Sequence, residues 1–375
     1  MSERLRVVVL FGGRSAEHEI SCISARSVMD ALDPERFDVI PVGITREGHW
    51  HRMAGPPALP AETGRMPEVT EGSGMTVELA TERAGREIVG ADGSRAPIDV
   101  VLPVLHGPMG EDGAVQGMLE LADTPYVGAG VLGSALGMDK AVQKVLFAAA
   151  GLPVVPYETV REPEWLEDAE GVAARVAALG YPVFTKPATL GSSVGISKAH
   201  EPAALDACMD EAFRYARKAV VERGIESVRE IECAVLGNDD PVASVCGEVV
   251  PRGHAFYDYD AKYLDEYGAE LRIPAPIAPA LSAKLQRLAV SAFTVVACAG
   301  MARVDLFVRD DEVWLNEINT IPGFTSISMY PKLWEASGLS FAALVQRLLD
   351  LAVERHEAEG AKRIDVQELH GRVDP

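Results

Sequence analysis

The sequence has no excess of basic residues, no closely spaced cysteine pair and no long hydrophobic run. Lys and Arg number 35 against 56 Asp and Glu, which gives a formal net charge of −21 over 375 residues. Nucleic acid and anionic membrane surfaces repel so acidic a chain, and we expect neither as a main partner. The first residues lead directly into a short apolar run that glycines end, a pattern unlike a signal peptide or a membrane span.

Cysteine is scarce and scattered along the chain. No two cysteines form a CxxC pair or stand at the spacing of a metal site, which favours a reduced, cytoplasmic setting. The five positions are Cys22, Cys208, Cys233, Cys246 and Cys298.

The length predicts two or three domains at about 150 residues each. Short apolar runs at 5–11, 37–44 and 98–105 are typical of strands buried on both faces of a parallel sheet. Residues 51–97 are rich in Pro, Gly and Thr, and we expect loops there with a hairpin around 76–89. Residues 1–135 are therefore predicted to form an α/β domain.

The middle of the chain predicts a compact α+β domain over 136–225. Asp139 is placed to cap a helix over 140–150, and a second helix is expected over 165–179. A strand over 181–187 then leads into a loop rich in glycine and serine.

The last part predicts a third domain over 226–360, followed by a polar tail, 361–375, for which no order is expected. Its expected elements are strands over 229–236 and 242–250, a helix over 281–296, paired strands over 302–308 and 313–319, and a helix over 341–356.

Acidic and amide side chains alternate along the two paired strands. Arg303 and Asp305 share one face of the first strand, and Glu317 and Asn319 share one face of the second. If a turn at 309–312 joins the strands, these faces lie together, and their oxygens suit Mg²⁺. The alternatives are that Arg303 simply pairs with the carboxylates or that the polar face is solvated.

Lys186 ends a strand directly before the loop Leu190-Gly191-Ser192-Ser193-Val194-Gly195. The loop is not a Walker A motif, yet its glycines and serines can present N–H and hydroxyl donors to phosphates. With Lys140, this loop predicts a triphosphate cradle. Alternatively, both lysines are surface charges and the loop is a flexible connection.

Glu17 and His106 each follow a strand of the first domain, where ligands of open α/β sheets bind. Glu17 could face a substrate ammonium group, or it could simply be an acid in the first turn of a helix. His106 could be catalytic or structural. Residues 256–263, FYDYDAKY, suit a lid over phosphates or a loop packed by its own aromatic side chains.

Together these segments resemble the D-alanine–D-alanine ligases of the ATP-grasp superfamily, over nearly the whole chain. The motifs that carry the resemblance are GGRSAEHEIS (12–21), HGPMGEDG (106–113), MDK (138–140), KPATLGSSVGIS (186–197), FYDYDAKY (256–263), ARVDLF (302–307) and NEINTIPGFTSISMYP (316–331). Their order and variety, rather than any single motif, make the resemblance specific.

The resemblance implies a three-domain ATP-grasp fold with a Rossmann-like N-terminal domain and ATP between the other two domains. The implied ATP-binding residues are Lys140, Lys186 and Ser193 at the phosphates, Lys262 at the γ-phosphate, and Glu222, Ile225 and Glu230 near the adenosine. Asp305, Glu317 and Asn319 would hold two Mg²⁺ or Mn²⁺ ions, and K⁺ is a candidate activator.

For the substrates, the resemblance implies that Glu17 binds the ammonium group of the first D-alanine beside His106. Ser192 and Tyr263 would join Glu17 in one hydrogen-bonded network, and Arg303 would stabilise an oxyanion. The second D-alanine would be held by Gly323, Ser328 and Met329.

The implied reaction is ATP-dependent ligation of two D-alanines through an acyl phosphate, for peptidoglycan synthesis, in a homodimer. One alternative is a related ligase that uses D-lactate, D-serine or another amino acid second. Another is a nucleotide-binding regulator that has lost turnover. A Rossmann oxidoreductase fits poorly, because GGRSAE stands where GxGxxG is expected.

Overall fold

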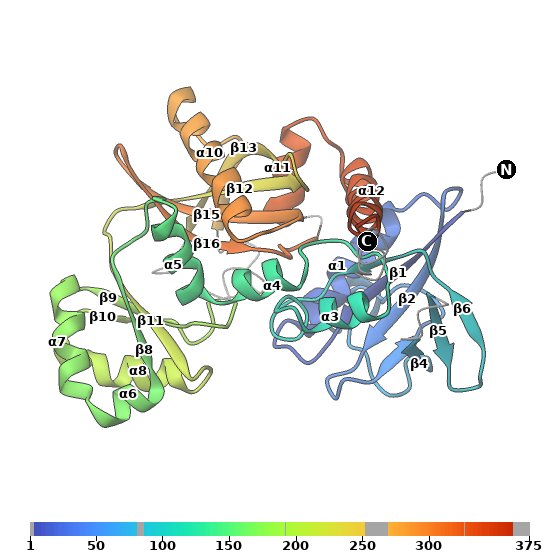
Figure 1. Ribbon diagram of the computed structural model, residues 1–375, viewed down its shortest axis with the longest axis horizontal. Helices are drawn as coiled ribbons and strands as arrows, with labels where there is room; N and C mark the ends of the chain where they lie inside the picture. The colour runs from blue at the N-terminus through green and yellow to red at the C-terminus, as the bar shows by residue number, and fades with distance from the viewer. Residues whose placement is uncertain (1–3, 81–85, 192, 252–268, 326, 363–375) are drawn as a thin grey trace, which may run out of the picture.

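The computed structural model describes residues 4–80, 86–191, 193–251, 269–325 and 327–362. These residues form three β-sheets of seven, four and five strands, with helices packed on each of them (Figure 1). The observed architecture is thus a mixed α/β fold with three sheets, as the sequence predicts.

The first sheet has the strand order β6-β5-β4-β3-β2-β1-β7, and β2, β1 and β7 run parallel. Its strands are β1 (Leu5–Gly12), β2 (Phe37–Ile44), β3 (Trp50–Arg52), β4 (Met75–Leu79), β5 (Glu87–Gly90), β6 (Arg95–Pro97) and β7 (Val100–Pro103). Its helices are α1 (His18–Ala31), α2 (Pro60–Thr63) and α3 (Ala114–Leu121).

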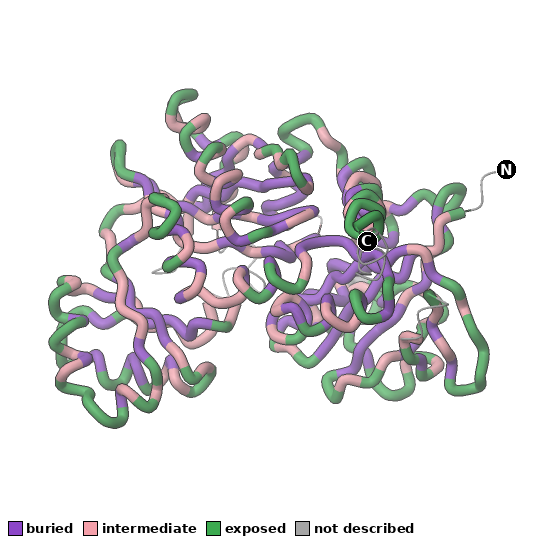
Figure 2. Tube along the Cα trace, in the orientation of Figure 1, coloured by how far each residue is buried: buried purple, intermediate pink, exposed green. Residues whose placement is uncertain are grey.

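Strand β1 is buried on both faces, as its unbroken apolar run requires. Val7, Val9 and Phe11 belong to one apolar cluster with α1, whereas Val8 and Leu10 belong to another with α3. In Figure 2 the purple, buried segments of the tube follow this strand between its neighbours β2 and β7. The carboxyl ends of β1 and β7 therefore have fixed positions, and the loops that follow them start from a rigid base.

The second sheet is antiparallel, with the order β10-β9-β11-β8. Its strands are β8 (Tyr157–Arg161), β9 (Val183–Pro187), β10 (Ser197–Ala199) and β11 (Lys218–Arg223). The helical segments α6 (Glu162–Glu167), α7 (Ala169–Leu179), η1 (Pro202–Ala204) and α8 (Leu205–Phe213) accompany it. α4 (Val131–Met138) and α5 (Lys140–Ala149) lead from the first sheet to the second.

The third sheet is also antiparallel, with the order β14-β13-β12-β15-β16. Its strands are β12 (Arg229–Gly237), β13 (Val242–Pro251), β14 (Ala269–Arg272), β15 (Gly300–Arg309) and β16 (Glu312–Asn319). Helices α10 (Pro279–Val295), α11 (Met329–Ala336) and α12 (Phe341–Gly360) complete this part of the chain. α10 covers one face of the sheet, where Leu285 and Phe293 pack against Val304 and Leu306.

One apolar cluster joins the first sheet to the third. It contains Val9 of β1, Met301 of β15, and Leu344 and Leu348 of α12. No single helix among the described residues is both long and apolar enough to cross a membrane. The helices α11 and α12 reach the length and apolar composition of a membrane span only when they are counted as one segment. The two helices are bent by 103° relative to each other.

Most expected elements are present with boundaries shifted by a few residues. Asp139 caps α5 by accepting hydrogen bonds from the backbone N–H groups of Ala141 and Val142, both at 3.1 Å. The hairpin expected around 76–89 is the antiparallel pair β4–β5.

Most of the described residues in 51–97 lie outside helices and strands, as expected, although the short strands β3 to β6 extend the first sheet there. One expectation is wrong. The single helix expected over 165–179 is divided at Asp168, whose side chain caps α7 by accepting a hydrogen bond from the N–H of Gly171 at 2.9 Å.

We expect the Leu285→Ala substitution to lower the free energy of unfolding by roughly 2–5 kcal/mol, because Leu285 of α10 is fully buried against the third sheet. Urea titration followed by circular dichroism measures this change. The matched control is Leu166→Ala, whose side chain is 79% exposed, with an expected change below about 0.5 kcal/mol. Equal effects of the two substitutions would contradict the assigned packing of α10.

Candidate active site

The β15–β16 hairpin places its polar residues on one face. Asp305 lies directly opposite Glu317, and Arg303 lies opposite Asn319. The next strand, β12, places Glu232 opposite Asp305 in the same way. Since directly opposed residues point to the same side of a sheet, three carboxylates form a row across three strands. We call Glu232, Asp305 and Glu317 the carboxylate row.

Arg303 is held firmly within this row. Its Nε and Nη2 atoms each donate a hydrogen bond of 2.7 Å to Asp305, and Nε also lies 2.9 Å from Glu232 Oε2. In the described part of the chain, Nη1 makes no hydrogen bond. Burial alone would lower the pKa of Arg303, but the charges of Asp305 and Glu232 outweigh it and raise the pKa well above the usual value. Arg303 is a fixed, permanently charged donor.

Lys140 connects the carboxylate row to the second sheet. Its Nζ lies 2.9 Å from Glu317 Oε2 and donates a hydrogen bond of 3.0 Å to the carbonyl oxygen of Leu190. Burial disfavours the charged amine, yet the adjacent Glu317 carboxylate raises its pKa. A single cation therefore contacts both the hairpin of the third sheet and the serine- and glycine-rich loop of the second.

Glu222 sits between two lysines. Its two oxygens lie 2.9 Å from Nζ of Lys144 and 2.9 Å from Nζ of Lys186. Lys186 also donates a hydrogen bond of 3.1 Å to Asn316 Oδ1. Burial by itself would raise the pKa of Glu222, but the two ammonium charges outweigh it and lower the pKa to about 2. This buried group of charges has more lysines than carboxylates and favours an anionic ligand beside it.

A cavity of about 400 Å³ opens between the second and third sheets. Its lining includes Lys140, Lys186, Ser193, Glu222, Ile225 and Glu230, together with Glu232, Asp305 and Glu317 of the carboxylate row. The sequence-predicted nucleotide residues that the structure describes therefore line one space, with the carboxylate row in the same wall. Apolar Phe184, Ile225 and Phe307 supply surfaces on which a flat ring can stack.

Glu17 and His106 lie where the first sheet meets this cavity. Glu17 is buried, and a Cβ built on Gly191 would lie 3.6 Å from its Oε2 atom, as would one on Gly107. The imidazole of His106 is also buried, its Nε2 lies 3.4 Å from Ser24 Oγ, and the backbone of Ile321 lies beside it. Burial lowers its pKa and the nearby Glu17 opposes that shift, so the ring is neutral near pH 7. Loops from all three sheets thus converge on Glu17 and His106.

Glu111 belongs to the same cluster, although the sequence did not single it out. Its Oε1 accepts a hydrogen bond of 2.6 Å from the N–H of Gly107. Burial and the negative charge of Glu17 raise its pKa to about 8. The carboxyl group is therefore largely protonated near neutral pH and adds little negative charge beside Glu17.

Ser328 occupies the N-cap position of α11 close to Gly323, and its side chain makes no capping hydrogen bond to the helix. Its Oγ accepts a hydrogen bond of 3.1 Å from the N–H of Thr325, and a Cβ on Gly323 would lie only 2.9 Å from this oxygen. The first N–H groups of a helix attract anions, so this end of α11 suits a carboxylate. Met329 is buried behind it.

The metal ligands proposed from the sequence lie together. No cluster of three or more His, Cys, Asp or Glu side chains with metal-site geometry occurs among the described residues. Mg²⁺, however, is commonly held by one or two carboxylates together with substrate phosphates and water. Asp305 and Glu317 are opposed across the hairpin, and Asn319 Nδ2 lies 3.2 Å from Asp305 Oδ2. This donor set fits such an ion at the edge of the cavity.

Three sequence-predicted site residues, Ser192, Lys262 and Tyr263, lie outside the described residues, as does the expected lid 256–263. Sequence reasoning also missed Glu232, Lys144 and Asn316. Only Lys144 carried a usable signal, because it stands four residues after Lys140 and so shares a face of α5. Glu232 gains its position from the pairing of β12 with β15, and Asn316 gains its position from a β-bulge in the β15–β16 pairing.

Family models cover most of the chain. A model described as the D-ala D-ala ligase N-terminus matches residues 6–129, and one described as the D-ala D-ala ligase C-terminus matches residues 146–350. The chain is similar to a D-alanine–D-alanine ligase of Thermoanaerobacter sp., with 48% identity over 94% of this chain and 98% of the relative. It is 46% identical to D-alanine–D-alanine ligase A of Escherichia coli, over 96% and 98% of the two chains.

Solved structures agree with these matches. The D-alanine–D-alanine ligase of Coxiella burnetii superposes with a TM-score of 0.81 at 37% identity, covering 95% of this chain and 97% of that one. The VanG D-Ala:D-Ser ligase of Enterococcus faecalis superposes with a TM-score of 0.82 at 35% identity, covering 93% and 100%.

We expect the Glu222→Gln substitution to remove a pH-dependent part of the stability. Because the pKa of Glu222 falls from 4.5 to about 2 on folding, its stabilisation is present above pH 4.5 and is lost as the pH falls towards 2. The wild type should exceed the variant at pH 7 by on the order of 3 kcal/mol. This difference should shrink on acidification, as measured by urea titration at each pH. A difference independent of pH would contradict the assigned charge state.

Proposed function

The chain belongs to the D-alanine–D-alanine ligase family, and we propose that it joins two D-alanine molecules while ATP is converted to ADP and phosphate. The observation that carries the proposal is the carboxylate row facing Lys140 and Lys186 across one cavity. Such an arrangement suits phosphoryl transfer, in which positioning and charge stabilisation supply most of the catalysis.

We assign the nucleotide to the cavity between the second and third sheets. Lys140, Lys186 and Ser193 would contact the phosphates there, which their position in the lining supports. Glu222 and Ile225 would contact the adenine, and Glu230 the ribose. We carry over from the family resemblance a γ-phosphate contact for Lys262.

We assign two Mg²⁺ or Mn²⁺ ions to Asp305, Glu317 and Asn319, with K⁺ as a candidate activator. When bound, such ions neutralise negative charge on the phosphates that react. The row supplies the oxygens, while Lys140 and Arg303 hold its side chains in position.

The first D-alanine lies beside Glu17 and His106 in this proposal. Buried Glu17 would accept hydrogen bonds from the substrate ammonium group, and protonated Glu111 leaves that pairing uncontested. Ser192 and Tyr263 would join Glu17 in a hydrogen-bonded network, as the resemblance implies. Gly323, Ser328 and Met329 would hold the carboxylate of the second D-alanine at the N-terminus of α11.

The reaction then has two steps. The carboxylate of the first D-alanine attacks the γ-phosphorus, which forms an acyl phosphate and releases ADP. The neutral amine of the second D-alanine attacks the acyl carbon, and the tetrahedral oxyanion accepts hydrogen bonds from Arg303. Phosphate leaves as the peptide bond forms. The Nη1 group of Arg303, which has no hydrogen bond in the described part of the chain, is the donor available for that oxyanion.

A second candidate function is ligation of D-alanine to D-serine. It is favoured by one observation, the TM-score of 0.82 to a structure described as a D-Ala:D-Ser ligase. The two functions share the first step and differ only in the second nucleophile. Supplying D-alanine and D-serine together therefore distinguishes them.

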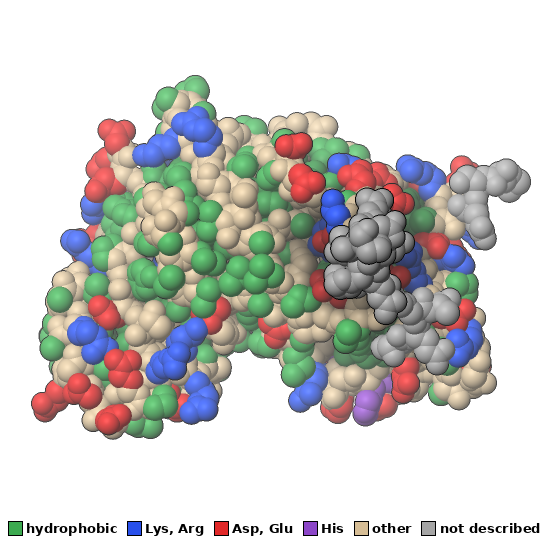
Figure 3. Space-filling model, viewed as in Figure 1, with side chains coloured by type: hydrophobic (Ala, Val, Ile, Leu, Met, Phe, Trp, Pro, Cys, Tyr) green, Lys and Arg blue, Asp and Glu red, His purple; other side chains and the backbone are tan. Residues whose placement is uncertain are grey.

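We further propose a cytoplasmic homodimer with no nucleic-acid or membrane partner, and three domains at 1–135, 136–225 and 226–360. ATP as substrate supports the cytoplasmic location. Figure 3 shows hydrophobic side chains gathered over α4 and α5, where Leu132 and Val145 are 62% and 56% exposed, and this supports a contact between two copies. Sedimentation equilibrium tests the dimer, which would have twice the monomer mass of 40.1 kDa.

The direct test of function incubates the protein with ATP, Mg²⁺, D-alanine and D-serine and identifies products by mass. We expect D-alanyl-D-alanine as the main product, with one ADP formed per dipeptide. D-alanyl-D-serine as the main product would favour the second candidate. ADP formation without any dipeptide would overturn both.

We expect the Glu317→Ala substitution to reduce dipeptide formation by roughly a hundredfold or more, because it removes one oxygen donor and the partner of Lys140. The matched control is Glu312→Ala at the other end of β16, where the glutamate pairs only with the exposed Arg309 among described residues. The control should retain activity, and both variants should keep their secondary structure. Unchanged ligation by the Glu317 variant would refute the metal assignment.

A further inference from the structure

A second cavity, of about 300 Å³, lies beyond the carboxyl ends of β1 and β7. In this sheet β2 lies on one side of β1 and β7 on the other, so the chain reverses its direction of winding between β1 and β7. Ligands of open α/β sheets bind at such a reversal. The volume falls at the lower end of the range of roughly 300–1,000 Å³ for small-molecule sites.

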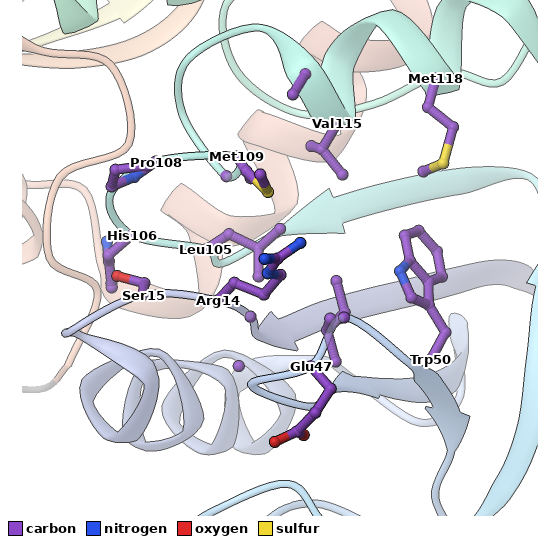
Figure 4. A pocket seen from close by; sticks show the side chains of 16 residues that line it. Arg14, Ser15, Glu47, Trp50, Leu105, His106, Pro108, Met109, Val115 and Met118 are labelled. Carbon is purple, nitrogen blue, oxygen red and sulfur yellow. The ribbon is translucent and has the colours of Figure 1, made fainter. Parts of the chain in front are cut away.

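The walls of this cavity are largely apolar. Trp50 of β3, Leu105 after β7, and Val115 and Met118 of α3 line it, and Figure 4 shows their side chains facing one space. Indole, thioether and aliphatic surfaces of this kind favour a flat or branched apolar group. A ligand of this cavity is therefore expected to place an apolar group against these walls.

One cation enters the cavity. Arg14 lies in its lining, and its guanidinium is directed towards Leu105 in Figure 4, whereas the carboxylate of Glu47 points away. Gly48 makes room for this side chain, because a Cβ there would lie 3.3 Å from Arg14 Cδ. The nearby Arg46 is paired with Glu19 and Glu68. Within the described part of the chain, Arg14 makes no hydrogen bond or ion pair.

This cavity is distinct from the nucleotide cavity. The two linings share no residue among those described, and of the proposed substrate residues only His106 reaches the second cavity. Glu17, which would bind the first substrate's ammonium group, does not line it. An occupant of the second cavity would therefore leave both the carboxylate row and Glu17 accessible.

We propose that this second cavity is a binding site for a small organic acid, whose carboxylate pairs with Arg14 and whose apolar body lies between Trp50, Leu105 and Met118. Arg14 presents a planar fork of N–H donors that matches a carboxylate. The site would be an addition to the ligase activity and would take no part in its chemical steps.

Titration calorimetry with hydrocinnamate, an aryl carboxylate, tests the proposal on the full chain. We expect one saturable site on the wild type. The Arg14→Met variant should bind at least about tenfold more weakly, because a charge-assisted hydrogen bond is lost. The neutral primary amide of hydrocinnamate should bind the wild type more weakly by a similar factor. Met118→Trp, which fills the cavity, should abolish binding.

The matched control is Arg52→Met, which removes an exposed arginine two residues from Trp50 that does not line the cavity, and it should bind as the wild type does. Saturating ADP with Mg²⁺ should leave the hydrocinnamate affinity unchanged. No saturable binding by the wild type would overturn the proposal, as would equal binding by the Arg14 variant. Displacement of hydrocinnamate by ADP or by D-alanine would place the probe in the catalytic site and also overturn it. None of these results changes the outcome of the dipeptide assay. The proposed ligase activity and the proposed second binding site are therefore tested independently.

Discussion

The site depends on a balance between three carboxylates in a row and the cations that face them. Glu232, Asp305 and Glu317 would repel one another in a partly buried wall, and Arg303 and Lys140 offset two of the three charges. The remaining negative charge suits a divalent cation. Around Glu222 the balance is reversed, since two lysines share one carboxylate. The cavity thus has an acidic wall and a basic wall, as a metal–nucleotide complex requires.

Each wall of the cavity is built on a different sheet. The hairpin of the third sheet carries Asp305 and Glu317, and the second sheet carries Lys186 and Glu222. Lys140 and Lys144 belong to α5, which leads from the first sheet to the second. A charge balance that spans separate elements forms only when the whole chain is folded, which accounts for the long sequence distance between the residues involved.

Local patterns in the sequence predicted most of the helices and strands, and they predicted the part of the site that lies on the paired strands β15 and β16. The alternation along 302–319 predicted that the polar faces of the two strands lie together. The register next to the turn would, however, place Asp305 opposite Asn316, and a β-bulge after this point brings Glu317 opposite Asp305 instead. Glu232 was missed because nothing local indicates that β12 pairs with β15. Lys144 was missed because a lysine on an amphipathic helix is usually exposed, and here it is fully buried against Glu222. Local patterns also failed to predict that Asp168 divides the helix expected over 165–179 into α6 and α7.

The apolar cluster shared by β1, β15 and α12 has a mechanical consequence. Drawing the first and third sheets apart would expose this common core to water, whereas the four-stranded sheet has its own separate core around Val172, Val221 and Met209. Rotation of that smaller unit as a rigid body would therefore leave the shared core closed to water, whereas separation of the two larger sheets would open it.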